Sequence, residues 1–344
     1  MRAAETIASL DEIRDLLKAL PQADEEAAAT ALKRQGQLTK PAGSLGRLEE
    51  LAVWLATWQG RHPPVVERPY AAVFAGNHGI ARKGVSAYPA EVTAQMVQNF
   101  IDGGAAVNQL CSLANADLRV YEMALDEPTG DISEEAAMSE ADCAHAMAYG
   151  MMAVEPGIDV LSLGEMGIGN TTVAAAICHG LFGGEAADWV GPGTGIDEAR
   201  LGEKVALVAR AVERHRDALG DPLQVLCRLG GRELAAIAGA VLAARMARTP
   251  VVLDGYACTA AAAVLYAIDP ATLDHCVISH VSAEPGHKRL LARIGKRALV
   301  DLGMRLGEAS GAMIAVLLLK AAVACHNGMA TFAEAGVSGP GDKT

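Results

Sequence analysis

The chain has 344 residues, of which 51% are hydrophobic and only 4% aromatic, and its mean hydropathy is +0.21. This length accommodates a large domain and a smaller one, and the richness in Ala, Gly, Val and Leu favours parallel strands packed under helices over a β-sandwich. The net charge of −12 excludes a generic nucleic-acid-binding surface, so an anionic ligand would have to be bound by local groups.

The seven cysteines are scattered and show no C-x-x-C spacing, so neither a disulfide framework nor a zinc site is indicated. We expect buried thiols in a reducing compartment.

The first residues contain an early acid and no apolar signal-peptide core. The longest apolar stretch, residues 309–324, is interrupted by Gly311 and Lys320 and is shorter than the ~20 residues of a membrane span. We therefore expect a cytoplasmic protein with no membrane or nucleic-acid partner, and we interpret this stretch as a core helix.

Amphipathic helices are predicted from residue 7 to residue 58, interrupted by a basic loop at residues 40–47. Lys40 and Arg47 in this loop are either solvated charges or ligands. The first strand is predicted at residues 70–75. Asn77 and His78 follow it, and Tyr88 precedes a helix predicted at residues 91–100. Open α/β sheets place binding sites at such strand ends.

Residues 158–163 are an apolar, strand-like run that ends in the glycine-rich segment 164–172, after which the chain becomes helical. Glycines let the backbone approach an anion, the first free N–H groups of the helix point at it, and Thr hydroxyls add donors, so this segment predicts a phosphate site. Gly164, Gly167 and Gly169 miss the G-x-G-x-x-G spacing, and G-x-x-x-x-G-K-[ST] is absent, which argues against kinases, ATPases and dinucleotide-binding enzymes. An ordinary glycine-rich turn with a Thr cap is the alternative.

Further segments continue the alternation of strands and helices. Strands are predicted at residues 117–121, 250–253 and 276–281, the last of these ending the sheet, and residues 187–195 are predicted as another strand end with a glycine-rich turn. Lys204, on the helix after this turn, is either a surface lysine or the cation nearest to the two glycine-rich loops. The acidic segment 128–142 is expected to be an exposed loop. This spacing predicts an α/β fold with a doubly wound, mainly parallel sheet.

Glu308 precedes the apolar stretch and is flanked by small and apolar residues rather than cations. It is either a carboxylate that stabilises a helix N-terminus or a base tuned by an apolar pocket.

Seven motifs, in order along the chain, resemble the nicotinate-nucleotide:dimethylbenzimidazole phosphoribosyltransferase family, which makes the α-ribazole phosphate of the cobalamin lower ligand. They are Lys40-Pro41 with residues 43–49, His78-Gly79, residues 164–172, residues 191–195, Asp254-Gly255, residues 282–287 and residues 305–308. The resemblance implies a Rossmann-like sheet in a large domain (residues 63–302), a small helical domain from both chain ends (residues 1–62 and 303–344), a homodimer, and no cofactor or metal.

The resemblance also implies roles for individual residues. Glu308 would be the general base, with Glu165 at the reacting centre. The expected nucleotide-binding residues are Gly167, Gly169, Asn170, Thr171, Thr172, Gly191, Pro192, Gly193, Thr194, Lys204, Asp254, Gly255, Ser279 and His280. The expected base-binding residues are Tyr88, Gln95, Met96, Met166 and Leu306. Some members have Ser and Gln where this chain has Tyr88 and Met96, so the preferred base is left open.

The expected small-molecule substrates are nicotinate mononucleotide and 5,6-dimethylbenzimidazole or a related base. The pyridinium of nicotinate mononucleotide leaves without an acid, whereas the attacking benzimidazole must lose a proton to a base, with inversion at C1′. Two alternatives stay open: a dinucleotide-dependent oxidoreductase, which shares the succession of strand, glycine turn and helix, and a non-catalytic nucleotide-binding module.

Overall fold

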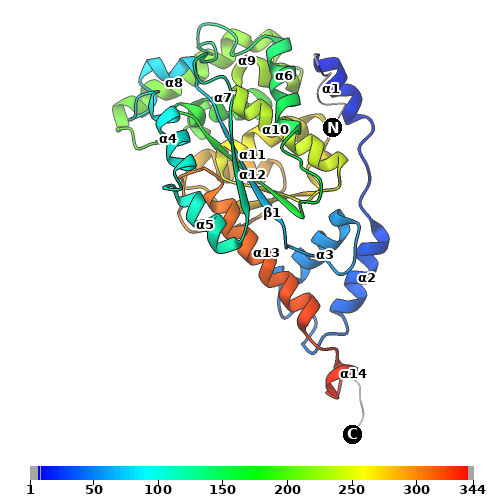
Figure 1. Ribbon diagram of the computed structural model, residues 1–344. Helices are drawn as coiled ribbons and strands as arrows, with labels where there is room; N and C mark the ends of the chain where they lie inside the picture. The colour runs from blue at the N-terminus through cyan, green and yellow to red at the C-terminus, as the bar shows by residue number, and fades with distance from the viewer. Residues whose placement is uncertain (1–6, 8, 340–344) are drawn as a thin grey trace.

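Six parallel strands form one sheet in the order β2-β1-β3-β4-β5-β6, as the predicted doubly wound α/β fold requires. The computed structural model describes residues 7 and 9–339 (Figure 1). The strands are β1 Pro69–Ala75, β2 Asp117–Glu122, β3 Val160–Met166, β4 Val251–Leu253, β5 Cys276–His280 and β6 Ala298–Val300.

Both faces of the sheet are buried, because successive side chains of a strand point to opposite sides. In β1, Ala72 and Phe74 face one apolar cluster while Ala71 and Val73 face the other. The first face is covered by α6 Glu140–Met151, α7 Asn170–Phe182, α9 Pro222–Leu229, α10 Arg232–Met246 and α11 Tyr256–Ile268. The second is covered by α3 Arg47–Gln59, α4 Val92–Ile101, α5 Ala106–Ala114 and α13 Ser310–Gly328.

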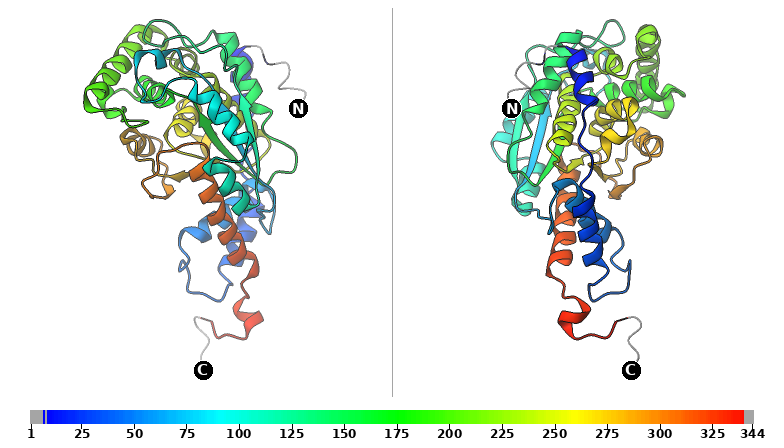
Figure 2. Two further views of the ribbon diagram at one scale, coloured as in Figure 1. Left: turned by 60° about the vertical axis from the view of Figure 1, so that its left-hand side comes forward. Right: turned by 90° about the vertical axis from the view of Figure 1, so that its right-hand side faces the viewer.

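A narrow helical extension projects below the sheet (Figures 1 and 2). It consists of α2 Glu25–Gln35, α3 and the lower half of α13, which pack side by side, followed by α14 Phe332–Ala335. In α13, Ala312 and Val316 lie in the core beside the sheet, whereas His326 contacts Gln35 of α2 (Nε2–Nδ1 2.8 Å). One helix therefore runs from the sheet into the extension.

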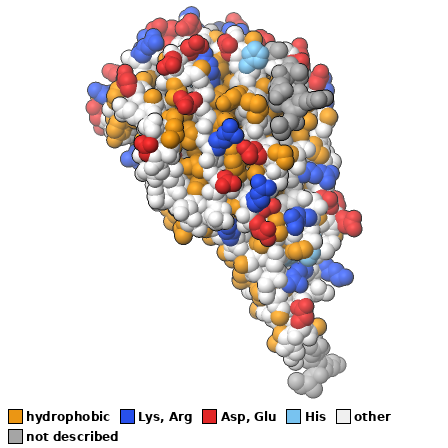
Figure 3. All heavy atoms as spheres, viewed as in Figure 1, with side chains coloured by type: hydrophobic (Ala, Val, Ile, Leu, Met, Phe, Trp, Pro, Cys, Tyr) orange, Lys and Arg blue, Asp and Glu red, His pale blue; other side chains and the backbone are white. Residues whose placement is uncertain are grey.

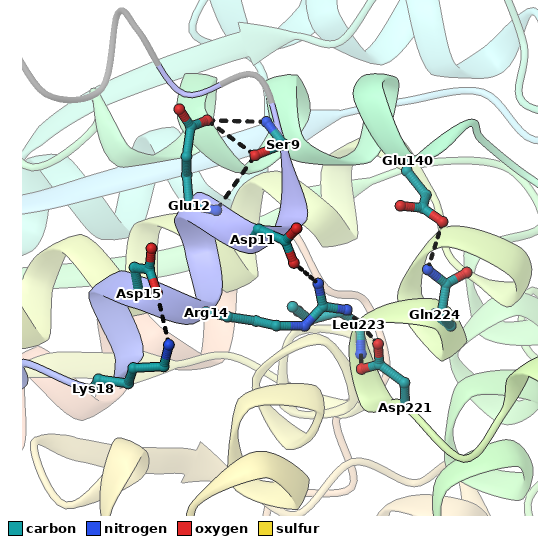
Figure 4. A network of polar contacts seen from close by, with 10 residues as sticks. All are labelled: Ser9, Asp11, Glu12, Arg14, Asp15, Lys18, Glu140, Asp221, Leu223 and Gln224. Atoms are coloured by element: carbon teal, nitrogen blue, oxygen red, sulfur yellow. Dashed lines mark hydrogen bonds and ion pairs between the residues drawn. The ribbon is translucent and has the colours of Figure 1, made fainter.

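The first helix, α1 Leu10–Leu17, packs on α6 instead of on α2 and α3 in the extension. Arg14 of α1 pairs with Asp11 and with Asp221, the N-cap of α9, and Gln224 of α9 bonds Glu140 of α6 (Figure 4). The division of the chain into domains at residues 62 and 303 stays a prediction, but by its packing α1 lies with the α/β body.

The remaining elements lie around the sheet. They are the helices α8 Glu198–His215 and α12 Pro285–Arg293 and the 3₁₀ helices η2 Gly79–Lys83, η3 Ala186–Asp188, η4 Arg216–Ala218 and η5 Pro270–Leu273. Acidic and basic side chains are interspersed on the face drawn in Figure 3, and no basic stripe crosses that face.

Two strand predictions are wrong. Residues 187–190 form no strand: η3 occupies this stretch, where Asp188 accepts a hydrogen bond from the Glu185 N–H (3.1 Å) and so favours a local turn. The strand at residue 276 is not the last, because β6 follows it. β6 is only three residues long and half-buried, which leaves a weak periodic signal.

The apolar C-terminal helix is longer than expected. α13 has 19 residues and a mean hydropathy of 1.5, so by length and composition it could cross a membrane. Its apolar side, however, packs against α3, α5 and β5, as predicted for a core helix. Six of the seven cysteines are buried, Cys325 is half-buried, and all are free thiols.

The strand order reverses between β1 and β3, because the chain runs outward from β1 to β2 and then returns to place β3 on the other side of β1. In open α/β sheets, ligands bind outside the carboxyl ends of the strands near such a reversal. The fold therefore directs attention to the loops that follow β1, β3, β4 and β5.

Candidate active site

A cavity of about 470 Å³ opens at the carboxyl ends of β3, β4 and β5. It is lined by Tyr88, Glu165, Asn170, Thr171, Gly193, Thr194, Gly255, Tyr256, Ala257, His280, Ser282, Glu284, Arg305, Leu306 and Gly307. A slightly larger cavity of about 540 Å³ lies at the opposite, amino ends of β3 and β4, but it contains none of the predicted site residues. The first cavity is the candidate site because the charged and polar side chains converge there.

Two helices begin at this cavity. Gly169 is the N-cap of α7 with φ +97°, a left-handed conformation that glycine adopts readily, and Gly255 is the N-cap of α11. Neither cap supplies a side-chain hydrogen bond; in α7 the Asn170 and Thr172 N–H groups bond to the Gly167 and Gly169 carbonyls, and the first residues of both helices line the cavity. This arrangement suits an anion, as predicted for the glycine-rich segment.

Glu308 lies directly behind Gly307 of the cavity wall and is 5% exposed. Glu308 and Ala309 both adopt left-handed backbone conformations (φ +63° and +62°), and the Glu308 N–H donates to the Glu165 carbonyl (3.2 Å). Burial raises the pKa of the Glu308 carboxyl to about 7. A carboxylate with this pKa is half ionised near neutral pH and can accept a proton there.

Glu165 lies at the end of β3 and accepts a hydrogen bond from the Asn170 amide. Burial raises its pKa well above the usual range, and the negative charges of Asp254, Glu233 and Glu308 add to the effect. Asp254, which is fully buried and accepts from the Ala312 N–H (2.9 Å), has its pKa raised to about 7, again mainly by burial. Burial and the neighbouring negative charges thus disfavour the ionised form of Glu165, which makes Glu308, perturbed by burial alone, the better base.

Lys204 projects from α8 into a corner of the site. Its Nζ donates to Thr171 Oγ1 (2.9 Å) and to the Gly191 carbonyl (3.0 Å), and the side chain is fully buried. Burial lowers its pKa to about 8, against the opposing effect of the Glu284 charge. Lys204 is thus a desolvated cation beside a helix N-terminus, which is a favourable place for a phosphate monoester.

The mouth of the cavity is bounded by two loops that contact each other. Thr194 Oγ1 accepts a hydrogen bond from the Ala87 N–H (2.9 Å) and lies 3.0 Å from Ser86 Oγ. These bonds hold Tyr88, which is 55% exposed, at the opening, where Leu306 is 56% exposed. An apolar rim of this kind can accommodate a flat aromatic ring.

The structure brings most of the predicted site residues together. Nine line the cavity: Tyr88, Glu165, Asn170, Thr171, Gly193, Thr194, Gly255, His280 and Leu306. The others, apart from Gln95 and Met96, lie next to lining residues in the sequence or, for Lys204, bond to one: Met166, Gly167, Gly169, Thr172, Gly191, Pro192, Lys204, Asp254, Ser279 and Glu308. Gln95 is exposed on α4, and Met96 packs against the second core cluster. Neither lines the cavity, so their base-binding role stays a prediction.

Six cavity residues were absent from the predicted site. They are Tyr256, Ala257, Ser282, Glu284, Arg305 and Gly307. Four of them lie inside the motifs that carry the family resemblance, so the motifs contained the signal. Tyr256 and Ala257 immediately follow the Asp254-Gly255 motif and open α11.

Three other polar residues singled out by the sequence lie in buried or local contacts. Lys40 pairs with Glu49 (2.8 Å) and Arg47 pairs with Glu50, in the turn before α3 and its first turn. His78 Nε2 lies 2.8 Å from Glu233 Oε1, and neither side chain is exposed. In the part of the chain that the structure describes, no three or more His, Cys, Asp or Glu side chains lie close enough together to hold a metal ion.

Comparison with known proteins agrees with this geometry. A family model described as phosphoribosyltransferase matches residues 20–337. The chain is 61% identical over 328 residues to the nicotinate-nucleotide–dimethylbenzimidazole phosphoribosyltransferase of Rhizobium meliloti (strain 1021), covering 95% of this chain and 97% of that protein. It is 60% identical over 329 residues to the protein of the same name from Rhizobium etli (strain CIAT 652), with coverages of 96% and 97%.

A crystal structure of the enzyme of that name from Thermus thermophilus superposes with a TM-score of 0.84 at 40% identity, covering 92% of this chain and all of that one. Family model, relatives and solved structure all span nearly the whole chain. The chain belongs to the nicotinate-nucleotide–dimethylbenzimidazole phosphoribosyltransferase family.

Proposed function

We propose that this protein transfers the 5-phosphoribosyl group of nicotinate mononucleotide to 5,6-dimethylbenzimidazole or a related base, giving α-ribazole 5′-phosphate and nicotinate. The observation that carries this proposal is the position of Glu308, a buried carboxyl with a pKa of about 7, next to Gly307 in the wall of a cavity whose Thr171 accepts a hydrogen bond from Lys204.

The reaction needs one bond to form at C1′ as another breaks. A lone pair on one benzimidazole nitrogen attacks C1′ from the α face, and the bond to the pyridinium nitrogen breaks with its electron pair returning to that ring, which leaves as neutral-ring nicotinate. The proton on the other benzimidazole nitrogen moves to the Glu308 carboxylate. A single displacement of this kind inverts C1′ and balances without a further reactant.

The remaining groups orient the nucleotide. Lys204, with the N-terminus of α7, is suited to the 5′-phosphate, and Tyr88 and Leu306 at the mouth are suited to the incoming base. Glu165 is suited to hydrogen bonding with the nucleotide rather than to accepting the proton, because burial and neighbouring carboxylates raise its pKa and disfavour its ionised form. Because bicyclic bases that differ by one methyl-sized contact differ in binding by only ~1–3 kcal/mol, the acceptor pocket admits relatives of dimethylbenzimidazole.

The direct test is to mix the protein with nicotinate mononucleotide and a panel of benzimidazoles and to search for α-ribotides by mass spectrometry. Formation of an α-ribotide with equimolar nicotinate supports the proposal. Binding of the nucleotide without nicotinate release would indicate a non-catalytic binding module, and a change in reduced nicotinamide absorbance would indicate an oxidoreductase.

We further propose that the protein acts as a cytoplasmic homodimer. The family resemblance supports this assembly, and an exposed Tyr88 and Leu306 at the cavity mouth are consistent with a second surface covering them. Light scattering at micromolar concentration tests it, and a mass equal to one chain would contradict it.

A further inference from the structure

Glu284 is a buried carboxylate in the cavity to which the proposed mechanism gives no task. It is 3% exposed and follows β5 at the start of α12. Its Oε1 accepts a hydrogen bond from the Gly193 N–H (2.9 Å), whereas its Oε2 is buried and has no hydrogen-bond partner among the residues that the structure describes. A buried carboxylate oxygen left in this state costs free energy unless a ligand donates to it.

The loop that carries Glu284 is held in place by a chain of hydrogen bonds. The Ser282 N–H donates to His287 Nδ1 (2.8 Å), so His287 Nε2 carries the proton and lies 3.1 Å from Thr259 Oγ1, which itself donates to the Gly255 carbonyl (2.8 Å). The Glu284 N–H donates to Ser282 Oγ (3.2 Å). The loop after β5 is thereby tied to the turn after β4, and the carboxylate is in place before a ligand arrives.

The electrostatic surroundings keep this carboxylate useful as an acceptor. Burial raises the pKa of Glu284, while the charges of Lys204 and Arg305 and the hydrogen bond from Gly193 oppose that rise. A methyl group at Gly191 would overlap Glu284 Oε2, so the carboxylate lies directly against the glycine-rich turn of residues 191–195. Glu284 thus lines the cavity beside the same turn whose Gly191 carbonyl accepts a hydrogen bond from Lys204 (3.0 Å).

The chemistry of the proposed nucleotide identifies what can donate to this oxygen. Nicotinate mononucleotide carries a phosphate, a ring carboxylate and a pyridinium, none of which has an N–H or O–H to donate when the phosphate and carboxylate are ionised. Its only hydrogen-bond donors are the ribose 2′- and 3′-hydroxyls. The N–H of the acceptor base is matched to Glu308 in the proposed reaction.

We propose that Glu284 is the specificity residue for the ribose hydroxyls, accepting a hydrogen bond on its free Oε2 from the 2′- or 3′-hydroxyl of the nucleotide. The inference rests on the proposed function and deepens it. It predicts that the protein distinguishes ribonucleotides from deoxyribonucleotides through this side chain, with Lys204 binding the phosphate that both kinds of nucleotide share.

The test measures the affinity of nicotinate mononucleotide and of its 2′-deoxy and 3′-deoxy analogues by calorimetry, without an acceptor base. We expect the wild-type protein to bind the ribonucleotide about 10- to 100-fold more tightly than at least one deoxy analogue, as for a hydrogen bond to a charged group. Glu284→Gln should weaken the ribonucleotide by a similar factor and that analogue by much less, so that the ratio falls to within about threefold.

Two further variants keep the result interpretable. Glu284→Asp retains the charge but withdraws the carboxylate, and it should give an intermediate ratio; it also serves as the test if Glu284→Gln does not fold, as judged by thermal melting. Lys204→Met should weaken all three nucleotides by equal factors, because the phosphate is common to them. Glu203→Gln replaces the exposed neighbour of Lys204 in the sequence and should alter none of the three affinities.

The outcomes separate this inference from the function on which it rests. Equal losses for all three nucleotides in the folded Glu284 variants would overturn the role of Glu284 and leave the proposed function standing. If the wild-type protein bound none of the three nucleotides, the proposed function would fall and the inference with it.

Discussion

Glu308 and Glu165 are neighbours joined by a backbone hydrogen bond, yet their surroundings perturb the pKa values of the two carboxyls in different ways. Glu308 is perturbed by burial alone, whereas Glu165 is buried and also surrounded by Asp254, Glu233 and Glu308. Pairs of carboxyls whose environments separate their pKa values commonly divide acid and base roles. Here the division favours Glu308 as the proton acceptor.

Replacing Glu308 tests this division. Glu308→Gln keeps the shape of the side chain but removes the proton acceptor, so kcat should fall by roughly 10²–10⁴ while nicotinate mononucleotide binds nearly as before. Steady-state kinetics and nucleotide binding by calorimetry measure the two quantities. A near-normal kcat in Glu308→Gln, together with an inactive Glu165→Gln protein, would show that Glu165 and not Glu308 is the general base.

Lys204 gives a second prediction at this scale. Lys204→Ala should raise the KM for the nucleotide, because it removes a buried cation from a protein whose net charge repels anions. Since the side chain is fully buried, the loss should persist in high salt rather than shrink. KM measured at low and high ionic strength checks both statements, and an unchanged KM at low salt would refute the role of Lys204.

The sequence motifs and the family resemblance predicted most of the residues that the structure gathers at the cavity, because glycine-rich turns and strand ends are local features; their roles stay predictions. The sequence motifs could not predict which residues contact one another in the folded site. That Lys204 lies beside Thr171, or that Glu284 lies beside Gly193, depends on loops brought together from distant parts of the chain. Gln95 and Met96 failed to reach the cavity because their direction depends on the rotation of α4, which adjacent sequence does not determine.

At the scale of elements, the site depends on the contact between β3 and the start of α13. Gly164 of β3 faces Ala309, and a methyl group at Gly164 would overlap the Ala309 nitrogen and lie 2.6 Å from its Cβ. Only a glycine permits these two backbones to approach so closely. The same contact fixes the left-handed turn that carries Glu308.

We therefore expect Gly164→Ala to displace the turn and to lower both activity and stability. The overlap involves backbone atoms, which cannot rotate away, so the free energy of unfolding should fall by about 1–3 kcal/mol and kcat by at least ~10². Gly202→Ala is the matched control: this helical glycine has nothing within 4 Å of the added methyl, and the change should stabilise α8 by about 0.5–1 kcal/mol. Urea unfolding and activity assays check both, and equal behaviour of the two variants would contradict the argument.

At the scale of the whole molecule, two titrating groups set the pH dependence. Activity should rise with pH as Glu308 ionises near pH 7, and nucleotide binding should weaken as Lys204 loses its proton near pH 8. kcat/KM should therefore be bell-shaped, with its maximum between these values. In the pH profile of kcat, the decrease at acidic pH should occur at a lower pH than in the profile of kcat/KM, because the positive charge of the bound pyridinium favours the ionised form of Glu308.

Plots of kcat/KM against pH for two variants check the assignment of the two titrations to Glu308 and Lys204. The decrease at acidic pH should disappear in Glu308→Gln and the decrease at alkaline pH in Lys204→Met, and each variant should retain the other decrease. The raised pKa of Glu308 also makes the stability of the fold depend on pH. Between about pH 4.5 and pH 7 the native protein retains a proton on Glu308 that the unfolded chain has lost. The contribution of Glu308 to the free energy of unfolding therefore falls as the pH rises through this range. Glu308→Gln should flatten that part of the stability curve, as measured by urea unfolding.

The fold as a whole was largely predictable, because apolar runs bounded by glycine and polar residues mark buried parallel strands. β1, β3 and the three-residue β4 are almost entirely buried and were found, whereas β6, as short as β4 but only half-buried, was missed. The position of α1 on α6 could not be predicted, because its amphipathic pattern does not specify which apolar surface it covers.

The span of α13 from the sheet to the helical extension has a consequence for how the protein is made. α3 ends at Gln59, but the helix that covers its apolar side begins only at Ser310. At ~5–20 residues per second, a translating ribosome leaves that surface, and the part of the sheet that α13 covers, exposed for roughly 10–50 seconds. The nascent chain is therefore a natural client for chaperones, and Glu308, two residues before α13, joins the site only at the end of synthesis.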